Sequence, residues 1–500
     1  MKTFPGRYFI ALLLLFQSVF ALAQDDPDVI KNLAEKTWGV ASSCKVNDNE
    51  GVFQIALTDS TFELVALDNK MKVLWRNQYK GYAVACGKFK DNILAISDAR
   101  YSTGSGLFSW ETGSLNTYQA FLVDPQSGKT IAQKEILKRE AKHKEIAIAS
   151  FWNDGSDFSL IVRDADIHEQ SLFYTHLRDS TEDLTIVNLN EKLDPSYLKP
   201  HFPHETFISM RSNLQGDLFM LTTNGGSNLL ARRFEHGSVE PSSPILLICD
   251  TLNGYDAGRG YNAITPSLED RNILYLAIFH NNHDGDRELY MGKFDFTSTM
   301  AQSATEVFTG KNIRAIESSF EPLNAQFDKP NIGSQKKDLG VRYFQERNGK
   351  LIVVASEYFE TKVTYTTTKI GIISTGYTVT TWYEKALIIN SYDNNLKKQF
   401  QTLMPVYYEG KVPSATGYSF HENVLKVISN NQTDGIIYPA YGELDLATGH
   451  WSNLLLLNAN GKYASDSHII WFTNSFIVPS NRIHGMFTNK YNIDLYHYNN

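Results

Sequence analysis

Two kinds of short hairpin alternate along this chain. In the first kind, a polar turn leads into a strongly apolar run, as in residues 85–97 and 342–356. Continuously apolar runs such as 351–356 are typical of strands that are covered on both faces. The hairpin occurs eight times, over residues 42–57, 85–97, 149–162, 209–222, 264–279, 342–356, 418–429 and 468–480. Each copy is predicted to place a buried strand inside a sheet.

The second kind of hairpin has an Asp or Asn turn between two apolar runs, as in residues 66–75. Its further copies are 121–132, 291–302, 388–400 and 442–451, with looser ones near 172–187 and 229–247. Asp and Asn side chains accept hydrogen bonds from backbone N–H groups two residues on, which favours tight turns. The Asp residues of these turns are therefore predicted to be structural.

Together the two hairpins predict an all-β repeat architecture. The second strands of the first hairpin begin at Val52, Ile93, Phe158, Leu218, Ile273, Leu351, Val424 and Phe476. Each interval between them holds four short strands, which is the content of one propeller blade. No interval shows a sustained helical period. We predict a single closed β-propeller of eight four-stranded blades, with seven as the alternative count. Strands are named a to d from the axis outward.

The two ends of the chain carry different signals. Residues 1–23 combine basic Lys2 and Arg7 with an apolar run that ends in Ala-Leu-Ala, which is the pattern of a cleaved signal peptide. The run is shorter than the roughly 20 residues of a spanning helix. We therefore expect a secreted or periplasmic protein whose propeller occupies residues 24–500, with no transmembrane segment after signal removal. The last blade stops after 491–499 without a d strand, so residues 28–36 are predicted to supply it.

Composition limits the choice of partner. The formal charge is −8, and removal of Lys2 and Arg7 makes it −10. An acidic chain without a basic cluster argues against nucleic acid as a partner, and we expect a monomer. In an exported protein, Cys44 and Cys86 are the pair best placed to form a disulfide. The alternative, which the sequence supports at least as well, is that Cys44, Cys86 and Cys249 are all buried thiols.

The string ALDNKMKVLW, residues 66–75, carries a family resemblance. It resembles the repeat of quinoprotein-type eight-bladed propellers, in which an Ala-x-Asp turn precedes Thr-Gly and a Trp that docks between blades. Asp68 and Trp75 match this pattern, whereas Met71-Lys72 replaces Thr-Gly. Partial copies are Ser127-Gly128 and Thr448-Gly449 with Trp451. The resemblance implies an exported bacterial propeller. Dehydrogenases of that family use a vicinal Cys pair, which this chain lacks, so no quinone cofactor is expected.

Two polar segments resemble metal-binding loops. His280, Asn282, Asp284 and Glu288 are spaced like the ligands of a calcium loop, but the leading Asp is missing. Because this segment falls in a b–c connection, a plain hairpin turn is the preferred interpretation. Residues 152–157 are similar to calcium loops of integrin-like propellers, yet Trp152 stands at a ligand position, so an a–b turn is predicted. No metal site is expected.

Two b–c connections are longer than the others, at about 98–117 and 358–384. The second is rich in Thr and alternates, which predicts an extended hairpin that projects from blade six. In a propeller, both connections rise from the same face, and long loops on a rigid scaffold often carry function. The candidate binding residues on them are Tyr101, Trp110, Tyr365, Tyr377, Trp382 and Tyr383.

These observations favour a non-catalytic binding or scaffold protein. Exposed Tyr and Trp side chains suit a protein or carbohydrate partner on the loop-rich face. The alternative function is an exported hydrolase or lyase that acts on polysaccharide through paired carboxylates in the central funnel.

Overall fold

The computed structural model describes most of the chain after the first 26 residues. The described residues are 27–499, except 103–113, 142–143, 153–156, 172–173, 179–183, 225–227, 251–261, 321–326, 328–338, 368–374, 412–414, 460–467 and 484–489. The signal-peptide prediction and Trp110 therefore lie outside the described residues.

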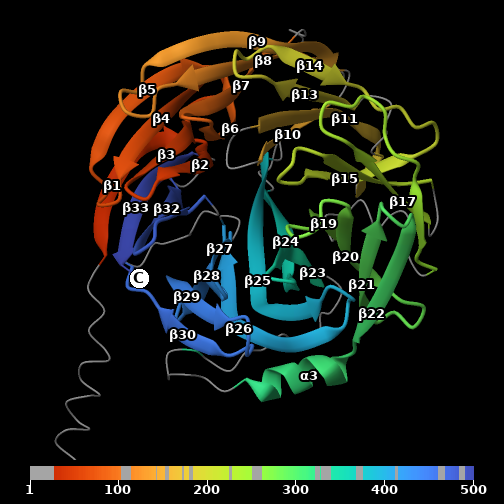
Figure 1. Cartoon of the computed structure of the whole chain (residues 1–500). Coiled ribbons are helices and arrows are strands. Elements are labelled where there is room, and N and C mark those ends of the chain that lie inside the picture. The colour runs from red at the N-terminus through yellow and green to blue at the C-terminus, as the bar shows by residue number, and fades with distance from the viewer. Residues whose placement is uncertain are drawn as a thin grey trace, which may run out of the picture.

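Eight antiparallel sheets stand around a common axis (Figure 1). Successive sheets follow one another around the ring in chain order, and the last blade lies beside the first. This arrangement is an eight-bladed β-propeller, which confirms the predicted all-β fold and blade count.

The first four blades follow directly in sequence. Their strands are β2 (Gly39–Asn47), β3 (Glu50–Ala56), β4 (Thr61–Asp68) and β5 (Val73–Lys80) in blade one; β6 (Tyr82–Phe89), β7 (Asn92–Ser102), β8 (Ser114–Val123) and β9 (Thr130–Ala141) in blade two; β10 (Lys144–Trp152), β11 (Asp157–Ser171), β12 (Tyr174–Arg178), β13 (Thr185–Leu189) and β14 (Pro195–Leu198) in blade three; and β15 (Thr206–Ser212), β16 (Leu218–Thr223), β17 (Asn228–Phe234) and β18 (Ile245–Ile248) in blade four.

The second half of the ring includes a helix and the closing blade. Its elements are β19 (Asn262–Pro266), β20 (Ile273–Asn281), β21 (Arg287–Asp295) and β22 (Met300–Phe308) in blade five; α3 (Gly310–Ser319); β23 (Leu339–Arg347), β24 (Lys350–Thr367), β25 (Thr375–Asp393) and β26 (Lys398–Gly410) in blade six; β27 (Gly417–His421), β28 (Val424–Thr433), β29 (Ile436–Asp445) and β30 (Trp451–Leu456) in blade seven; and β31 (Ile470–Trp471), β32 (Ser475–Ile483), β33 (Tyr491–Asn499) and β1 (Asp28–Thr37) in blade eight.

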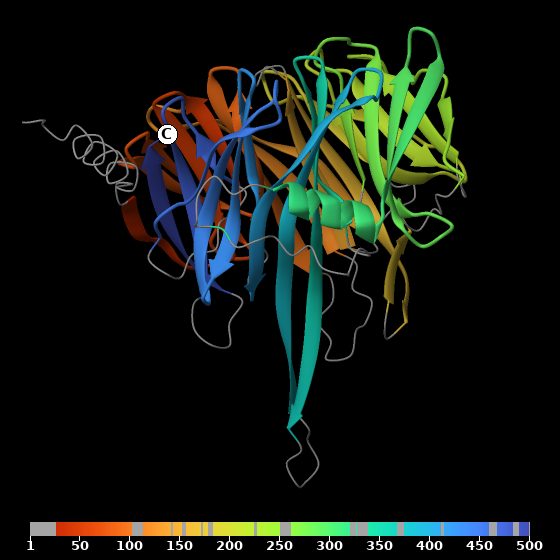
Figure 2. The same ribbon diagram turned by 90° about the horizontal axis from the view of Figure 1, so that it is seen from below.

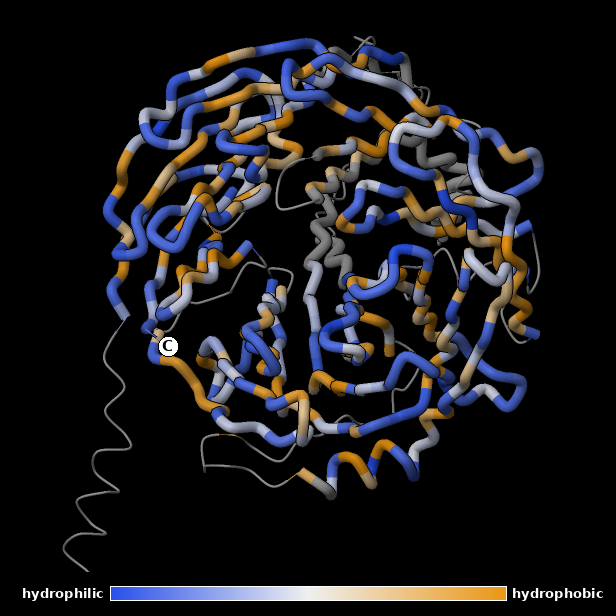
Figure 3. The backbone as a smooth tube through the Cα atoms, in the orientation of Figure 1, coloured by the Kyte–Doolittle hydropathy of each residue, from blue (hydrophilic) through white to orange (hydrophobic). Residues whose placement is uncertain are grey.

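The hydrophobic core is divided among the interfaces between blades. Eight clusters of buried side chains are found in the described residues, and each joins two neighbouring blades. Apolar segments accordingly run through the sheets all around the ring (Figure 3). Because each sheet is covered on both faces, its central strands are continuously apolar.

The ring closes through β1, which is the outer strand of blade eight and pairs antiparallel with β33. Two irregularities in β1 turn backbone N–H groups toward side chains of β33. Asn32 N donates to Asp494 Oδ1 at 2.8 Å, and Lys36 N donates to Asn492 Oδ1 at 3.2 Å. The predicted contribution of residues 28–36 to the last blade is confirmed.

The Asp turns between c and d strands have the predicted mechanism. Asp68 Oδ1 accepts from the backbone N–H groups of Lys70 (2.9 Å) and Lys72 (2.8 Å). Asp124 and Asp445 make equivalent bonds, which lower the pKa of each carboxyl.

Both Trp residues of the quinoprotein-like pattern dock on a neighbouring blade. Trp75 Nε1 donates to Pro125 O at 2.7 Å, and Trp451 Nε1 donates to Leu403 O at 2.9 Å. Each bond satisfies the indole N–H while its ring fills space between blades.

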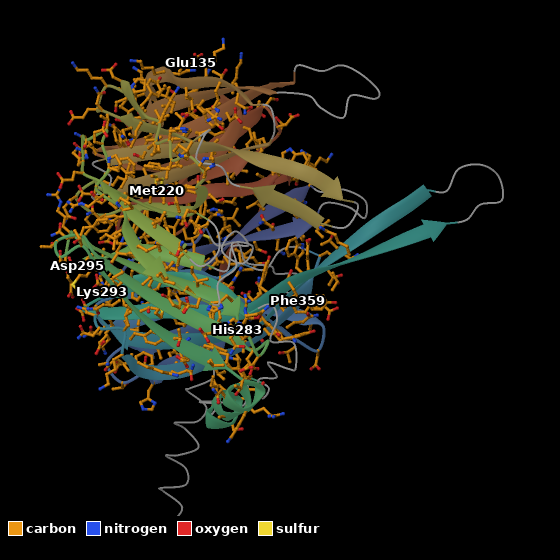
Figure 4. All side chains as sticks on the ribbon, turned by 90° about the vertical axis from the view of Figure 1, so that its right-hand side faces the viewer. Glu135, Met220, His283, Lys293, Asp295 and Phe359 are labelled. Atoms are coloured by element: carbon orange, nitrogen blue, oxygen red, sulfur yellow. The ribbon has the colours of Figure 1, made fainter. Side chains whose placement is uncertain are left out.

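Blade three differs from the prediction in two ways. The segment near 172–187 is no c–d turn, because β12 folds back on β11 and the c–d turn follows at Leu189–Pro195. The β11–β12 hairpin is a third long b–c excursion, and it projects on the same side as β24 and β25 (Figure 4).

The helix α3 was not predicted. Thr309 caps its start by accepting from Asn312 N at 3.1 Å, and Ile313 and Ile316 pack in the cluster between blades five and six. Within the described part of the chain, no helix has the length and apolar character needed to cross a membrane.

Candidate binding face around the blade-six hairpin

The hairpin of β24 and β25 projects far from the ring (Figure 2). Its strands contain 18 and 19 residues. The pairing of β23 with β24 ends at Glu357, and the pairing of β26 with β25 ends at Trp382. Residues 358–367 and 375–384 are called the blade-six ribbon from here on. The sequence prediction of a projecting hairpin is confirmed.

The ribbon belongs to the face that carries the b–c connections. Figure 4 shows Phe359 at the base of the ribbon, while Asp295, in a c–d turn, lies at the opposite face. The sequence explains the ribbon itself, because Thr, Val and Tyr are all residues that favour strands.

Aromatic pairs mark the base of the ribbon. Phe359 and Tyr383 are opposite each other in register and stack with ring centroids 4.8 Å apart. Tyr358 and Trp382 stack on the other side of the ribbon at 5.6 Å. Trp382 and Tyr383 are each half-buried, so two of the predicted binding residues present part of their rings to solvent.

The other predicted binding residues are placed by backbone register. Tyr365 and Tyr377 are directly opposite each other in the ribbon, at positions that share the parity of Phe359 and Tyr383. The four positions therefore belong to one face of the ribbon. Tyr101 lies in β7 of blade two, where its backbone is opposite Leu115 of β8.

Charged side chains are buried where the ribbon joins blade six. Glu384 is fully buried and lies 3.4 Å from Arg342 Nε. The Arg342 guanidinium also stacks on Tyr358, 4.1 Å from the ring centroid. Glu357, buried as well, binds Lys385 Nζ at 2.9 Å. The first pair joins the end of the ribbon to β23 of the ring, and the second joins β24 to β25 directly below the ribbon.

Tyrosines around these pairs are held in their neutral form. Burial raises the pKa of Tyr358 to about 12. Burial, with help from Glu409, also raises the pKa of Tyr407 to about 12, and Tyr407 Oη donates to Glu409 Oε2 at 2.9 Å. Neutral phenols and paired carboxylates can stack and hydrogen-bond with a ligand, but they are poor general bases.

The segment 280–288 is a hairpin turn, as preferred from the sequence. Asn282 Oδ1 accepts from the backbone N–H groups of Asp284 (3.1 Å) and Asp286 (2.9 Å). His280 is fully buried and lies 3.5 Å from Glu288 Oε1. The described residues contain no group of three or more His, Cys, Asp or Glu arranged to hold a metal ion. The a–b turn predicted over residues 152–157 falls largely outside the described residues, which place only Trp152 at the end of β10 and Asp157 at the start of β11.

Sequence reasoning missed the buried pairs at the base of the ribbon. Arg342 and Glu384 are 42 positions apart and lie on different strands, so nothing local in the sequence joins them. It also missed the β11–β12 hairpin, although the alternation of residues 163–171 after an apolar run was a signal for a strand that leaves the core.

Comparisons with known proteins show similarity in fold only. No family model and no curated protein matches the chain. Among solved structures, the chain is similar to BamB from Moraxella catarrhalis (10% identity, 79% of each chain, TM-score 0.35). It is also similar to the WD40 domain of SCAP from fission yeast, with 11% sequence identity, coverage of 94% of this chain and 98% of that chain, and a TM-score of 0.40. A third similar structure is that of polysaccharide lyase Uly1, with 10% sequence identity, coverage of 92% of this chain and 90% of that chain, and a TM-score of 0.38.

Proposed function

We propose that this protein is an exported, non-catalytic binding or scaffold protein whose partner docks on the b–c face at the blade-six ribbon. The observation that carries the proposal is the extension of the ribbon beyond both neighbouring strands. Export rests on the signal-peptide pattern of residues 1–23. The partner is a protein or a glycan, and the strand edges favour a protein.

The free edges of the ribbon support a protein partner. Beyond Glu357, β24 pairs only with β25 in the described structure, and before Trp382, β25 pairs only with β24. A two-stranded ribbon is marginally stable by itself in water. Unpaired strand edges also offer backbone donors and acceptors to an added strand. An extended segment of a partner protein would satisfy both conditions.

The carboxylates on this face are not arranged as a free acid and base. Glu357 and Glu384 each lie against a cation, Lys385 and Arg342 respectively. In hydrolysis of a glycosidic bond, one carboxyl must hold a proton while the other stays ionised. Both carboxyls are instead engaged by cations of the fold itself. Binding is therefore the better supported function.

A loop replacement tests the proposal. Glu360 and Trp382 are cross-strand partners, so residues 361–381 can be replaced by Asn-Gly, the preferred two-residue hairpin turn. We expect the variant to keep its melting temperature within about 2 °C, because the replaced residues lie beyond the strands of the ring. Its capture of a partner from a native envelope extract, or of glycans on an array, should fall at least tenfold.

The matched control is an equivalent trimming of the β11–β12 hairpin, which lies on the same side of the ring. We expect this control to retain partner binding. Unchanged capture by the ribbon variant would contradict the proposal, and collapse of its fold would show that the ribbon is structural. Loss of glycan binding alone would identify a glycan in place of a protein.

A further inference from the structure

Two cysteine thiols meet at the inner wall between blades one and two. Cys44 lies on β2 opposite Val52, and Cys86 lies on β6 opposite Ala95. β2 and β6 are the a strands of their blades, and they pack against each other. Cys44 is half-buried and Cys86 is buried, and both belong to the cluster that joins the two blades.

The surrounding hydrogen bonds fix the two strands at this point. The Cys86 backbone N–H donates to Ser42 Oγ at 2.7 Å, and Ser42 Oγ donates to Gln54 Oε1 at 2.7 Å. Gln54 Nε2 then donates to Ile96 O of blade two at 3.1 Å. The first and third bonds cross the interface between blades one and two, and the second joins β2 to β3 within blade one. Cys44 and Cys86 therefore lie on packed neighbouring strands within one cluster, and each thiol shifts the pKa of the other, so the two side chains are neighbours across the interface.

We propose that Cys44 and Cys86 are a disulfide site that takes a small-molecule disulfide as oxidant and ties blade one to blade two. Two cysteines that are neighbours on packed strands meet the first requirement of a disulfide, which is that the two residues lie close together. This inference stands on the thiol contact and is independent of the partner proposed for the blade-six ribbon.

The reaction has two exchange steps. The Cys44 thiolate, formed by loss of its proton to solvent, attacks one sulfur of the oxidant, forms a mixed disulfide and releases the other half as a thiol. The Cys86 thiolate then attacks Cys44 Sγ, breaks the mixed disulfide and releases the second half. The two protein thiols are oxidised by two electrons, and one oxidant molecule is reduced to two thiols.

The thiol contact gives the two residues different roles. The hydrogen bond with Cys44 is the largest cause that lowers the pKa of the Cys86 thiol. The same contact, together with burial, raises the pKa of Cys44. Cys86 is therefore the stronger thiolate, which suits the second step. Cys44, the more exposed of the two, suits the encounter with the oxidant.

Cys249 is an internal control in the same chain. It is fully buried between blades four and five, with Sγ 3.8 Å from Nε2 of His280. It does not contact Cys44 or Cys86, because those lie between blades one and two. The same oxidant should leave its thiol reduced.

The full chain, purified under reducing conditions and treated with oxidised glutathione, tests this site. After alkylation and digestion, we expect a disulfide-linked peptide pair that contains Cys44 and Cys86, and an alkylated Cys249. A crosslink that closes a loop of about 42 residues should raise the melting temperature by roughly 3–6 °C, and a reductant should reverse the rise.

Variants separate the disulfide from other effects of oxidation. Cys86→Ser should abolish the rise in melting temperature and leave glutathione attached to Cys44, whereas Cys249→Ser should keep the rise. Free, alkylatable Cys44 and Cys86 in the oxidised wild-type protein would overturn the proposal. A glutathione adduct that persists in the wild type would overturn it too. Because peptide mapping uses the wild type, the result does not depend on whether Cys86→Ser folds.

Discussion

Asp217 joins blades four and five through a buried network of charges. Its carboxylate is fully buried and lies 2.8 Å from Arg233 Nη2 of its own blade and 2.8 Å from Arg271 Nε of blade five. Burial alone would raise the pKa of Asp217. Hydrogen bonds from Arg271, the His236 backbone and Asn213 outweigh it and hold the pKa well below its usual range.

Replacement of Asp217 by Asn should therefore destabilise the fold by about 3 kcal/mol at pH 7, because Arg233 would keep its burial and lose its counter-charge. Because the pKa of Asp217 is lower in the folded than in the unfolded protein, its ionisation stabilises the fold. This contribution is complete above the unfolded-state pKa of about 4, and it is lost as the pH falls toward the folded-state pKa. Denaturant unfolding of both proteins at pH 7 and pH 3 measures this. The difference should be smaller at pH 3, and a constant difference would contradict the role of the charge.

The role of a single residue could be predicted from the sequence where its hydrogen-bond partners are close to it in the chain. Asp68 and Asp445 were assigned to turns because the backbone groups they bind are two residues away. Asp217 was not singled out, since Arg271 reaches it from the next blade. The binding role of Tyr365 and Tyr377 stays a prediction, although the register places them opposite each other.

At the scale of the element, the turn after β8 in blade two packs against β5 of blade one. Gly128 has φ +69° and lies against Trp75, whose ring would be 2.6 Å from an added Cβ. Its carbonyl also accepts from Asn77 Nδ2 at 2.8 Å. Glycine is required here both for the left-handed backbone and for the close approach of the indole.

Two glycine variants can separate these requirements. Gly285 has φ +78° with nothing near the position of an added Cβ, so Gly285→Ala should cost only the backbone strain, about 1 kcal/mol. Gly128→Ala should cost about 2 kcal/mol more, because Trp75 must move. Chemical denaturation of both variants tests the difference. Equal losses would show that the docking of Trp75 contributes nothing.

Strands were predicted better than other elements. The predicted starts of the b strands agree with the structure within two residues, because apolar runs and turn residues mark them locally. The helix α3 was missed because only Ile313 and Ile316 face the core, which is too few to form a periodic pattern. Its position is set by contact with β22 and β26.

At the scale of the whole molecule, stability depends on both ends of the chain. β33 pairs with β32 on one side and β1 on the other. Truncation after Lys490 would expose both edges and open the cluster between blades eight and one. We expect a fall in melting temperature of at least 10 °C or loss of soluble protein.

Deletion of residues 28–37 should have a comparable effect, because it removes the other member of the same pair. Removal of residues before Asp28 alone is the matched control and should leave the melting temperature unchanged. Thermal unfolding of the three proteins decides the question. An unchanged melting temperature after truncation at Lys490 would contradict closure through β1 and β33.

The overall architecture was predictable because eight similar hairpins were visible in the sequence. The identity of a binding partner could not be predicted, because a propeller face is assembled from loops of several blades. The base of the blade-six ribbon, with Arg342 on β23 and Glu384 on β25, shows how contacts between distant positions define such a surface. The repeated hairpins therefore identify the scaffold, whereas contacts such as that between Arg342 and Glu384 do not recur from blade to blade.

Closure through β1 also sets an order of events during biosynthesis. Asn32 and Asp494, which hydrogen-bond across the closing pair, are 462 residues apart in sequence. During synthesis, β1 therefore has no native neighbour until residues 491–499 have left the ribosome. Leu33 and Ala34, buried in the finished ring, stay open to chaperones throughout this time. Chaperones that bind exposed apolar segments of the nascent chain should therefore be needed longest at β1.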